Sequence, residues 1–430
     1  MSQEGPQRYG QRGPRWSRPA GNWETDGAPK SLGRVRILDF TWAWAGPHGT
    51  YLLASLGAEV IKVESRNRPD HTRMRSLAAG PSYRGIDEAP WFHDMNPNKL
   101  SLSVDLQKPQ AIEIIKRLAG HCDVVTENFR PGVLKKLGLS YENFRKVKPD
   151  IIMVSSSLNG SEGPEKNYIG YAPNFSALGG ISSLTGRPGE RPSVIGGRSD
   201  ILSGVYLAFA VVAALCFRQR TGKGLYVDLS SREAMACSAG EAFMEYALTG
   251  QIPKPEGNAD EKMAPHNCYP CRGEGEWISL AVGSDGEWEA LCRTMGEPRW
   301  AKESRFQSAE GRLRHREELD RGLGEWTRQW GRDELVNRLQ GAGIAAFGSM
   351  SNKDLAEDPH IHSRGLWVRI KPSGIKERVM VGPPFRFSKT PARLEKPAPL
   401  MGEHNRYILG EILGFSSKEI DILQEDGVLY

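Results

Sequence analysis

Short apolar runs alternate with amphipathic stretches through the first half of the chain. The runs at residues 35–40, 58–64, 122–127, 150–155 and 225–229 predict strands. Helical spacing of apolar residues is found around Leu52, Leu53 and Leu56 and over residues 109–119 and 131–137, with Gly57 and Gly138 as stop signals. Strands that alternate with helices predict an α/β domain with an open parallel sheet.

The pattern changes near residue 250. A helix over 201–218 and another to about Leu248 precede a stretch rich in Gly, Pro and charge at 250–265. Charged helices and a strand over Trp277–Val282 then predict a smaller α+β domain. We therefore expect a disordered basic extension (1–32), a large α/β domain (33–235), a linker with the small domain (236–340), and a return to the large domain (341–430).

Composition narrows the class of protein. Hydrophobic residues make up 39% and charged residues 25% of the 430 residues, which suits a sizeable core and a polar surface. A formal charge of +5 fits a small anionic ligand and is too weak and dispersed for nucleic-acid binding. The apolar run Ile201–Phe217 is interrupted by Ser203 and Gly204, so we interpret it as a buried core helix and expect no membrane partner.

The six cysteines predict no metal or redox centre. Cys268 and Cys271 have the spacing of a metal-binding pair, but a second pair is missing and Tyr269-Pro270 lies between them. No apolar leader segment precedes the domains, so free thiols in a cytoplasmic protein are the expectation.

The first strand–helix–strand unit raises the question of a dinucleotide. Glu64 ends the second strand, where an acid that binds ribose would lie. The intervening loop, however, lacks the first glycine of the phosphate-binding turn, and Pro47 removes a backbone N–H that would face a pyrophosphate. Nicotinamide or flavin binding is therefore not expected, although such a sheet edge could hold the nucleotide part of coenzyme A.

Eight segments in register carry a family resemblance that covers about residues 33–425. They are 38–47 (LDFTWAWAGP), 56–64 (LGAEVIKVE), 98–105 (NKLSLSVD), 123–132 (DVVTENFRPG), 196–204 (GGRSDILSG), 220–228 (RTGKGLYVD), 381–385 (VGPPF) and 400–404 (LMGEH). Together they resemble the class III coenzyme A transferases, the family of formyl-CoA and carnitine CoA-transferases and of α-methylacyl-CoA racemases.

The resemblance implies a Rossmann-like large domain, an interlocked dimer and a reaction that moves coenzyme A from an acyl-CoA donor to a carboxylic acid acceptor. A succinyl-CoA donor and an aromatic or dicarboxylic acid acceptor are one possibility. No cofactor beyond the CoA thioester substrate is implied. The partner is expected to be a second copy or a homologous subunit.

Asp200 matches the catalytic aspartate of the family, four residues before Gly204 and at the start of an apolar helix. A carboxylate can attack a thioester carbonyl and give a mixed anhydride, and helix amide dipoles keep it ionised. The alternative is that Asp200 is only a helix N-cap.

The resemblance also implies contacts to the thioester and to CoA. They are assigned to Trp44, Ala45, Arg66, Val104, Asp105, Asn128, Phe129, Arg130, Lys136 and Tyr171. Core packing remains an alternative for Trp42 and Trp44, and ordinary surface charge for Arg66 and Lys136. Many family transferases have glutamine where this chain has Trp44, so the sequence leaves the accepted acyl group open.

Two rival functions remain. Racemases of the family use a histidine–aspartate pair in a Gly-His-Asp motif, and the matching segment here is Gly170-Tyr171-Ala172, which disfavours racemisation. The chain could also be a CoA-binding partner subunit of a heteromeric transferase. The glycine-rich lid loop of the family corresponds to about 255–264, which has only one glycine here, so either this loop works differently or the lid comes from another segment.

Overall fold

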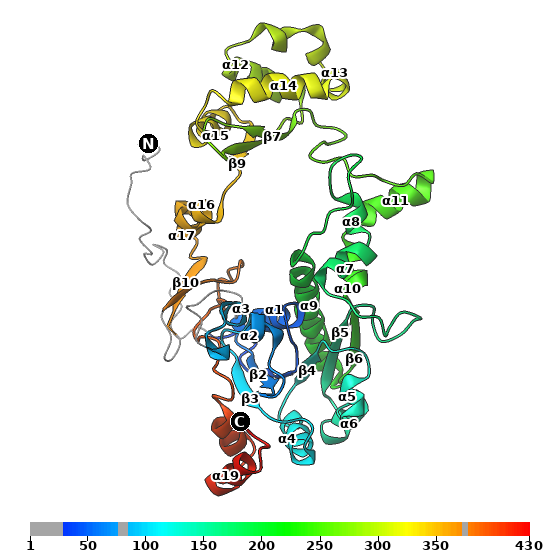
Figure 1. Ribbon diagram of the computed structural model, residues 1–430, viewed down its shortest axis with the longest axis vertical. Helices are drawn as coiled ribbons and strands as arrows, with labels where there is room; N and C mark the ends of the chain where they lie inside the picture. Colours follow the sequence, from blue (N-terminus) through cyan, green and yellow to red (C-terminus); the bar gives the residue numbers. More distant parts are fainter. Residues whose placement is uncertain (1–28, 76–84, 372–376) are drawn as a thin grey trace. The chain divides into compact units, whose positions relative to one another are not determined.

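A computed structural model describes residues 29–75, 85–371 and 377–430 and divides into two compact units (Figure 1). The first comprises Met1–Ser182, Val194–Gln251 and Pro359–Tyr430, and the second comprises Ser183–Ser193 and Ile252–Asp358. The main segment of the small unit, Ile252–Asp358, thus begins and ends later than the predicted 236–340, and Ser183–Ser193, which lie before that range, also belong to the unit. Of the predicted extension over 1–32, all but residues 29–32 lies outside the described residues.

A six-stranded parallel sheet organises the first unit. Its strands are β1 (Arg36–Asp39), β2 (Glu59–Glu64), β3 (Leu100–Ser103), β4 (Val124–Glu127), β5 (Ile152–Ser157) and β6 (Tyr226–Ser230). They lie in the order β3-β2-β1-β4-β5-β6, and every neighbouring pair is parallel. The predicted α/β class with an open parallel sheet is confirmed, and the strand order is that of the classic doubly wound fold.

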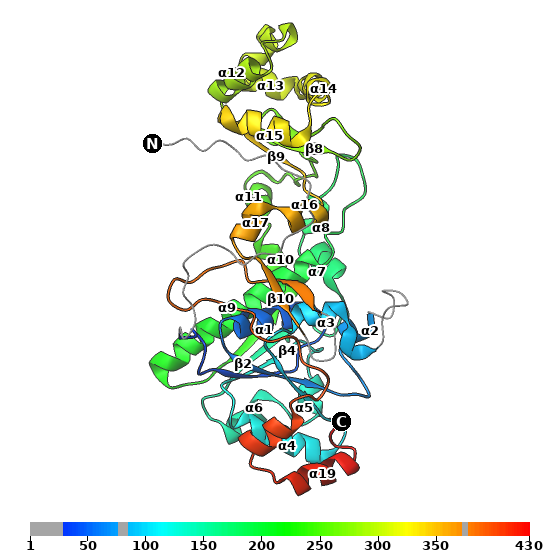
Figure 2. The ribbon, with the colours of Figure 1, turned by 90° about the vertical axis from the view of Figure 1, so that its left-hand side faces the viewer.

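Helices cover both faces of this sheet (Figure 2). On one face, α1 (Ala45–Ser55) and α9 (Arg198–Thr221) bury Leu53, Leu207 and Val211 against the strands. On the other face, α4 (Pro109–Ala119), α6 (Tyr141–Val147) and α19 (Ser417–Glu425) bury their own apolar stripes. A sheet covered on both faces explains why its strands are continuous apolar runs.

Shorter elements complete the first unit. They are α2 (His71–Arg75), η2 (Ile86–Glu88), α3 (Pro90–Met95), α5 (Val133–Lys136), α7 (Ala172–Leu178), α8 (Ile181–Leu184, reaching the unit boundary), α10 (Ser231–Cys237), α11 (Gly240–Thr249), α17 (Pro359–Ser363), β10 (Trp367–Ile370), β11 (Arg378–Val381), α18 (Asn405–Tyr407) and η5 (Ile408–Ile412). The single helix expected to run to about Leu248 is two helices, with Ser238 as the C-cap of the first and Ala239 as the N-cap of the second.

Two glycines set the close approach of α1 to α9. A Cβ at Gly204 would lie 2.6 Å from the Ala45 carbonyl oxygen, and a Cβ at Gly49 would lie 2.6 Å from the Gly204 carbonyl oxygen. Real side chains do not reach such distances, so both positions require glycine. Gly49 and Gly204 therefore let the first turns of α9 pack directly against α1.

The prediction that residues 201–217 form a buried core helix is correct for one face only. Ser203, Leu207 and Val211 are buried, whereas Phe209 and Phe217 on the outer face are exposed. Within the described residues, α9 is the one helix whose length and hydropathy would let it cross a membrane, a property that core helices share.

The second unit is a three-stranded antiparallel sheet packed against helices. Strands β7 (His266–Pro270), β8 (Trp277–Ala281) and β9 (Ala345–Gly348) lie in sequence order. Helices α12 (Asp285–Thr294), α14 (Arg316–Thr327) and α15 (Arg332–Gly341) bury Trp288, Leu319 and Leu335 against one face. The remaining elements are η3 (Arg299–Lys302), η4 (Ser304–Phe306), α13 (Ala309–Arg314) and α16 (Asn352–Glu357).

Candidate functional site

The strand order reverses between β1 and β4, which makes their carboxyl ends the topological switch point of the sheet. The Asn128 side chain ties the loops after these two strands together. Its Oδ1 accepts the Trp42 N–H at 2.7 Å, and its Nδ2 donates to the Trp42 carbonyl at 2.8 Å. The Phe129 ring meets the Trp42 ring edge-on, with centroids 5.5 Å apart. Ligands of open α/β sheets bind outside this edge.

Asp200 lies in the first turn of α9 and is half-buried. The N-cap of the helix is Gly197, so the alternative that Asp200 is the capping residue is wrong. Beside it, the Ser199 hydroxyl donates to the Ala172 carbonyl at 2.8 Å and holds the start of α7 against α9. Tyr171, the residue before α7, is exposed in this region.

Trp44 packs against the same end of α9. Its indole covers Gly197, where an added Cβ would lie 2.0 Å from the ring carbon Cζ3. On its other side the ring lies 5.2 Å from that of Trp91 in α3. Asp200, Trp44 and Tyr171 are thus brought into one region from three segments that are far apart in the sequence.

His48 is a member of this region that the sequence did not reveal. It lies on α1, and its Cβ is 3.0 Å from the position of an added Cβ at Gly204, one turn along α9 from Asp200. Burial and the charge of Lys99 lower the pKa of His48 to about 4, so the imidazole is neutral at neutral pH. Only its place next to Gly46-Pro47 could have drawn attention to it.

A buried ion-pair network lies beneath the loop after β1. Lys62 pairs with Asp70 at 2.9 Å and Lys99 with Asp39 at 3.3 Å, and all four side chains are fully buried. Burial, opposed by Asp39, lowers the pKa of Lys99 to about 8. At the end of β4, burial raises the pKa of Glu127 to about 7, and its Oε2 accepts the Phe129 N–H at 2.7 Å.

The residues assigned to CoA fall into two groups. Arg66, Asn128, Phe129, Arg130 and Lys136 follow strands β2 and β4, and the three cations among them are exposed. Arg66, Asn128, Phe129 and Arg130 come directly after their strands, at the carboxyl edge of the sheet, and Lys136 ends α5, the helix that follows β4. Positive charge there suits the phosphates of a nucleotide.

Val104 and Asp105 form the other group. Val104 is fully buried and pairs with Leu429, while the Asp105 N–H donates to the Val428 carbonyl at 3.0 Å. The Asp105 carboxylate accepts the Gln107 N–H at 3.0 Å. The contacts to Val428 and Leu429 hold the chain's C-terminal segment beside β3. Ala45 is also buried, and its carbonyl oxygen lies against Gly204 of α9.

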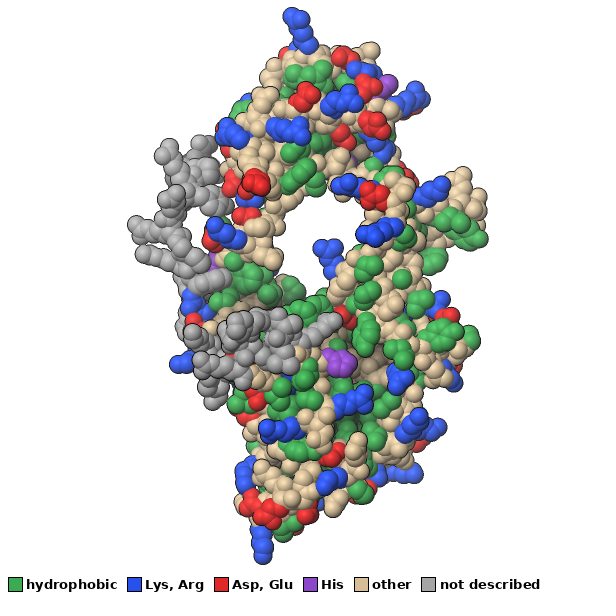
Figure 3. Space-filling model, in the orientation of Figure 1, with side chains coloured by type: hydrophobic (Ala, Val, Ile, Leu, Met, Phe, Trp, Pro, Cys, Tyr) green, Lys and Arg blue, Asp and Glu red, His purple; other side chains and the backbone are tan. Residues whose placement is uncertain are grey.

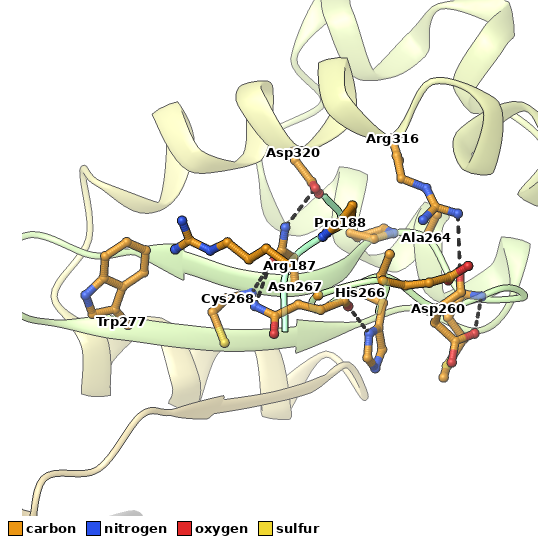
Figure 4. Close-up of a pocket in the computed structure, with 16 residues that line it drawn as sticks. Arg187, Pro188, Asp260, Ala264, His266, Asn267, Cys268, Trp277, Arg316 and Asp320 are labelled. Atoms are coloured by element: carbon orange, nitrogen blue, oxygen red, sulfur yellow. Dashed lines mark hydrogen bonds between the residues drawn. The ribbon is translucent and has the colours of Figure 1, made fainter. Parts of the chain in front are cut away.

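The second unit holds a separate cavity of about 560 Å³ (Figure 4). The segment expected to be a lid, 255–264, forms part of its wall. Asn267 donates to Asp320 at 2.8 Å, and the Asn258 carbonyl bonds His266 Nδ1 at 2.7 Å. Arg187 and Arg316 line the cavity together with Glu256 and Asp260, so its charges of both signs indicate no single class of ligand.

Cys268 and Cys271 do not form a site with other ligands. Cys268 lines the cavity, whereas Cys271 is buried in the core of the second unit. Over the part of the chain that the structure describes, no three His, Cys, Asp or Glu side chains are placed to hold a metal ion.

Comparisons with known proteins place this geometry in context. The model of CoA-transferase family III matches residues 32–405. A succinyl-CoA–D-citramalate CoA-transferase of Chloroflexus aurantiacus is 33% identical, over 93% of this chain and 98% of that protein. A succinate–glutarate CoA-transferase of Agrobacterium fabrum is 31% identical, over 89% of this chain and 95% of that protein.

A solved structure agrees with the fold. The CAIB/BAIF family protein from Brucella suis has a TM-score of 0.81 and 33% sequence identity, and the match covers 89% of this chain and 99% of that one. The match includes nearly all of the solved protein, so both units of this structure have counterparts in it.

Proposed function

The chain belongs to CoA-transferase family III and is a CoA-transferase, and on that premise we propose that it works through an acyl anhydride on Asp200. The observation that carries the proposal is the position of Asp200 at the N-terminal turn of α9, beside Trp44 and Tyr171. Helix amide dipoles favour the ionised carboxylate, and partial burial limits its solvation. Such a carboxylate is a competent nucleophile.

The proposed reaction balances in four steps. An Asp200 oxygen attacks the donor thioester carbonyl and releases CoA thiolate, which leaves a mixed anhydride. The thiolate then attacks the aspartyl carbonyl, which releases the donor acid and leaves an aspartyl-CoA thioester. The acceptor carboxylate repeats the attack, and the thiolate returns to the acceptor carbonyl. No net proton, electron or water is consumed.

For substrates we propose succinyl-CoA as donor and a dicarboxylic acid as acceptor. The two relatives named above act on succinyl or succinate groups together with citramalate or glutarate, both dicarboxylic acids. We propose that the exposed cations Arg66, Arg130 and Lys136 bind CoA phosphates outside the carboxyl edge of the sheet.

We also propose that the enzyme works with a second copy or a homologous subunit. No residue of α11 is buried, although it carries Phe243, Met244 and Leu248. Apolar side chains lie on the surface over this helix (Figure 3). The outer face of α9 is exposed and apolar as well. Exposed apolar faces of this kind are typical of subunit contacts. A monomeric mass by analytical ultracentrifugation would contradict this part of the proposal.

The test of the function is CoA exchange by the purified chain. Succinyl-CoA is incubated with single dicarboxylic acids, and product thioesters are identified by mass spectrometry. Asp200→Asn should lower kcat by about 1,000-fold or more, because it removes the nucleophile and keeps the shape. Asp150→Asn, before β5, is the matched control and should stay near wild type. Near-normal turnover by Asp200→Asn would overturn the assignment.

A further inference from the structure

We propose that the buried pair Lys62–Asp70 positions the loop that carries Trp44 to Asp200, and so sets turnover without touching substrate. The inference rests on the proposed function for its kinetic consequence. Neither residue is among the groups assigned to substrate or CoA. Both side chains are fully buried beneath residues 41–44.

The pair holds the two peptide groups that flank Trp42. Lys62 Nζ donates to the Thr41 carbonyl at 2.7 Å, and Asp70 Oδ1 accepts the Ala43 N–H at 3.1 Å. Lys62 Nζ also donates to Asp70 Oδ2 at 2.9 Å, so the two side chains that hold the loop are joined to each other. Asp70 is itself fixed, because its Oδ1 also accepts the Thr72 N–H at 2.9 Å at the start of α2. We call Lys62, Asp70 and the two contacts to residues 41 and 43 the loop clamp.

Ala43 needs such a contact. Its φ is +62°, a left-handed conformation that costs a residue with a Cβ on the order of 1 kcal/mol. The N–H that donates to Asp70 belongs to Ala43 itself, the residue that carries this strain. Without it, the loop would relax toward ordinary backbone angles and Trp44, one residue further on, would move with it.

Trp44 cannot hold its own place through polar contacts. Its indole N–H is buried and has no hydrogen-bond partner among the described residues. Its position therefore depends on packing against Gly197 and Trp91 and on the backbone that delivers it. Gly197 is three residues before Asp200, so a shift of the indole would change the surroundings of the carboxylate directly.

A purely structural role for the pair is the competing explanation. The same unit contains another fully buried pair, Arg73–Glu64 at 2.9 Å, whose further partners are Asp87 and the Pro399 carbonyl. Its hydrogen bonds to the Ile86 and Pro399 carbonyls and to Asp87 join distant segments of the chain, and none of these three involves residues 41–44. Buried ion pairs are weak contributors to stability compared with apolar packing, so the specific grip of Lys62 and Asp70 on the loop favours a positioning role.

The experiment compares wild type, Asp70→Ala, Ala43→Gly and the double variant by steady-state kinetics. Asp70→Ala should lower kcat about 10- to 100-fold, because displacement of active-site groups by about 1 Å has effects of that size. KM for the thioester should change less than about threefold, since Arg66, Arg130 and Lys136, the cations proposed to bind the CoA phosphates, are unchanged. Glycine adopts a positive φ without strain, so Ala43→Gly in the Asp70→Ala background should restore kcat by about threefold or more.

Asp123→Ala is the matched control. Asp123 also accepts a backbone N–H, that of Arg36 at 2.8 Å, and also pairs with a cation, Arg218 at 2.8 Å, but at the opposite end of the sheet. The kcat of Asp123→Ala should stay within about twofold of wild type, because no catalytic group is displaced. A folded Asp70→Ala that turns over like Asp123→Ala, or a loss of kcat that Ala43→Gly does not relieve, would overturn the proposal.

Two further measurements keep the proposal testable. If Asp70→Ala fails to fold, Lys62→Met/Asp70→Leu replaces it, because that pair leaves no lone buried charge; the same kinetic and rescue criteria apply. Hydrogen–deuterium exchange of the amides of residues 42–44 is independent of turnover and should be faster in the clamp variants only. If wild type transfers no CoA, the proposed function fails, while unchanged exchange in the variants would overturn the loop clamp itself.

Discussion

The two ends of the six-stranded sheet carry similar charged side chains in very different settings. At the amino end, Arg36 pairs with Glu59, and Arg218 pairs with Asp123 and Asp150, all partly exposed. Toward the carboxyl ends of β1 and β2, the pairs Lys99–Asp39, Lys62–Asp70 and Arg73–Glu64 are fully buried. The ion pairs at one end of the sheet are thus solvated, whereas those at the other end are enclosed.

This difference means that the cost of burying charged groups falls at the carboxyl end of the sheet. Removing a charge from water costs several kcal/mol, and a buried pair often stabilises no more than apolar packing would. Partly exposed pairs carry little cost and little benefit. Buried pairs that also hold loop backbone, as Lys62 and Asp70 do, are best explained by the precision they give to the loops outside the sheet.

The largest expected difference between the two ends is in stability. Arg73→Met should lower the free energy of unfolding by about 3–5 kcal/mol, because it leaves Glu64 buried without its bidentate partner. Arg218→Met at the amino end should cost less than about 1 kcal/mol. Urea unfolding of both variants measures this, and equal costs at the two ends would break the comparison.

A smaller difference is expected in the pH dependence of stability. The pKa of Glu127 is raised by burial to about 7, so folding favours the neutral acid. Its stabilising contribution is fully present below the ordinary pKa of about 4.5 and is lost as the pH rises through about 7. Glu127→Gln should remove this loss, on the order of 3 kcal/mol, since one pKa unit corresponds to about 1.4 kcal/mol.

The measurement is the unfolding free energy of wild type and Glu127→Gln between mildly acidic and mildly alkaline pH. The two curves should meet near the acidic limit and separate as the pH rises. Glu59→Gln, in a partly exposed pair at the amino end of β2, is the control. Parallel curves for wild type and Glu127→Gln would contradict the assignment of a buried, neutral acid.

The smallest effect concerns the exposed cations. Arg66→Ala and Lys136→Ala should each raise KM for CoA esters about fivefold, or on the order of 1 kcal/mol, with little change in kcat. In the proposed complex their charges bind phosphates far from the reacting carbonyl. Lys148→Ala, placed before β5, should leave KM unchanged. Equal sensitivity of a truncated pantetheine ester to Arg66→Ala would show that phosphate is not what this residue binds.

The sequence predicts most of the sheet and not what surrounds it. Strand β3 is not among the predicted strands, although Leu100-Ser-Leu-Ser103 alternates apolar and polar residues as a half-exposed strand does. In the structure all four are buried: Asn405 Oδ1 accepts the Ser103 N–H at 2.9 Å, and Ser101 Oγ accepts the Gly402 N–H at 2.9 Å. Partners some 300 residues away in the chain cannot be found from local pattern.

The site shows the same limit. Asp200 was predicted because a motif surrounds it, whereas His48, Lys62 and Asp70 were not, since their importance lies in contacts across α9 and the 41–44 loop. The left-handed conformation of Ala43 was also hidden, because alanine gives no local signal for it. Val104 is assigned to CoA from a motif, and that motif gives no sign that the residue is fully buried and pairs with Leu429 of the C-terminal segment.

The central claim, that Asp200 carries the acyl group, is tested most directly by following an oxygen atom. Succinyl-CoA is incubated with the enzyme and an acceptor acid whose carboxylate is labelled with a heavy oxygen isotope. The peptide that contains Asp200 is then examined by mass spectrometry. In the proposed reaction the acceptor leaves one of its oxygens on the Asp200 carboxylate at each turnover, so heavy oxygen should accumulate there and nowhere else in the chain. Full turnover without heavy oxygen at Asp200 would contradict the account.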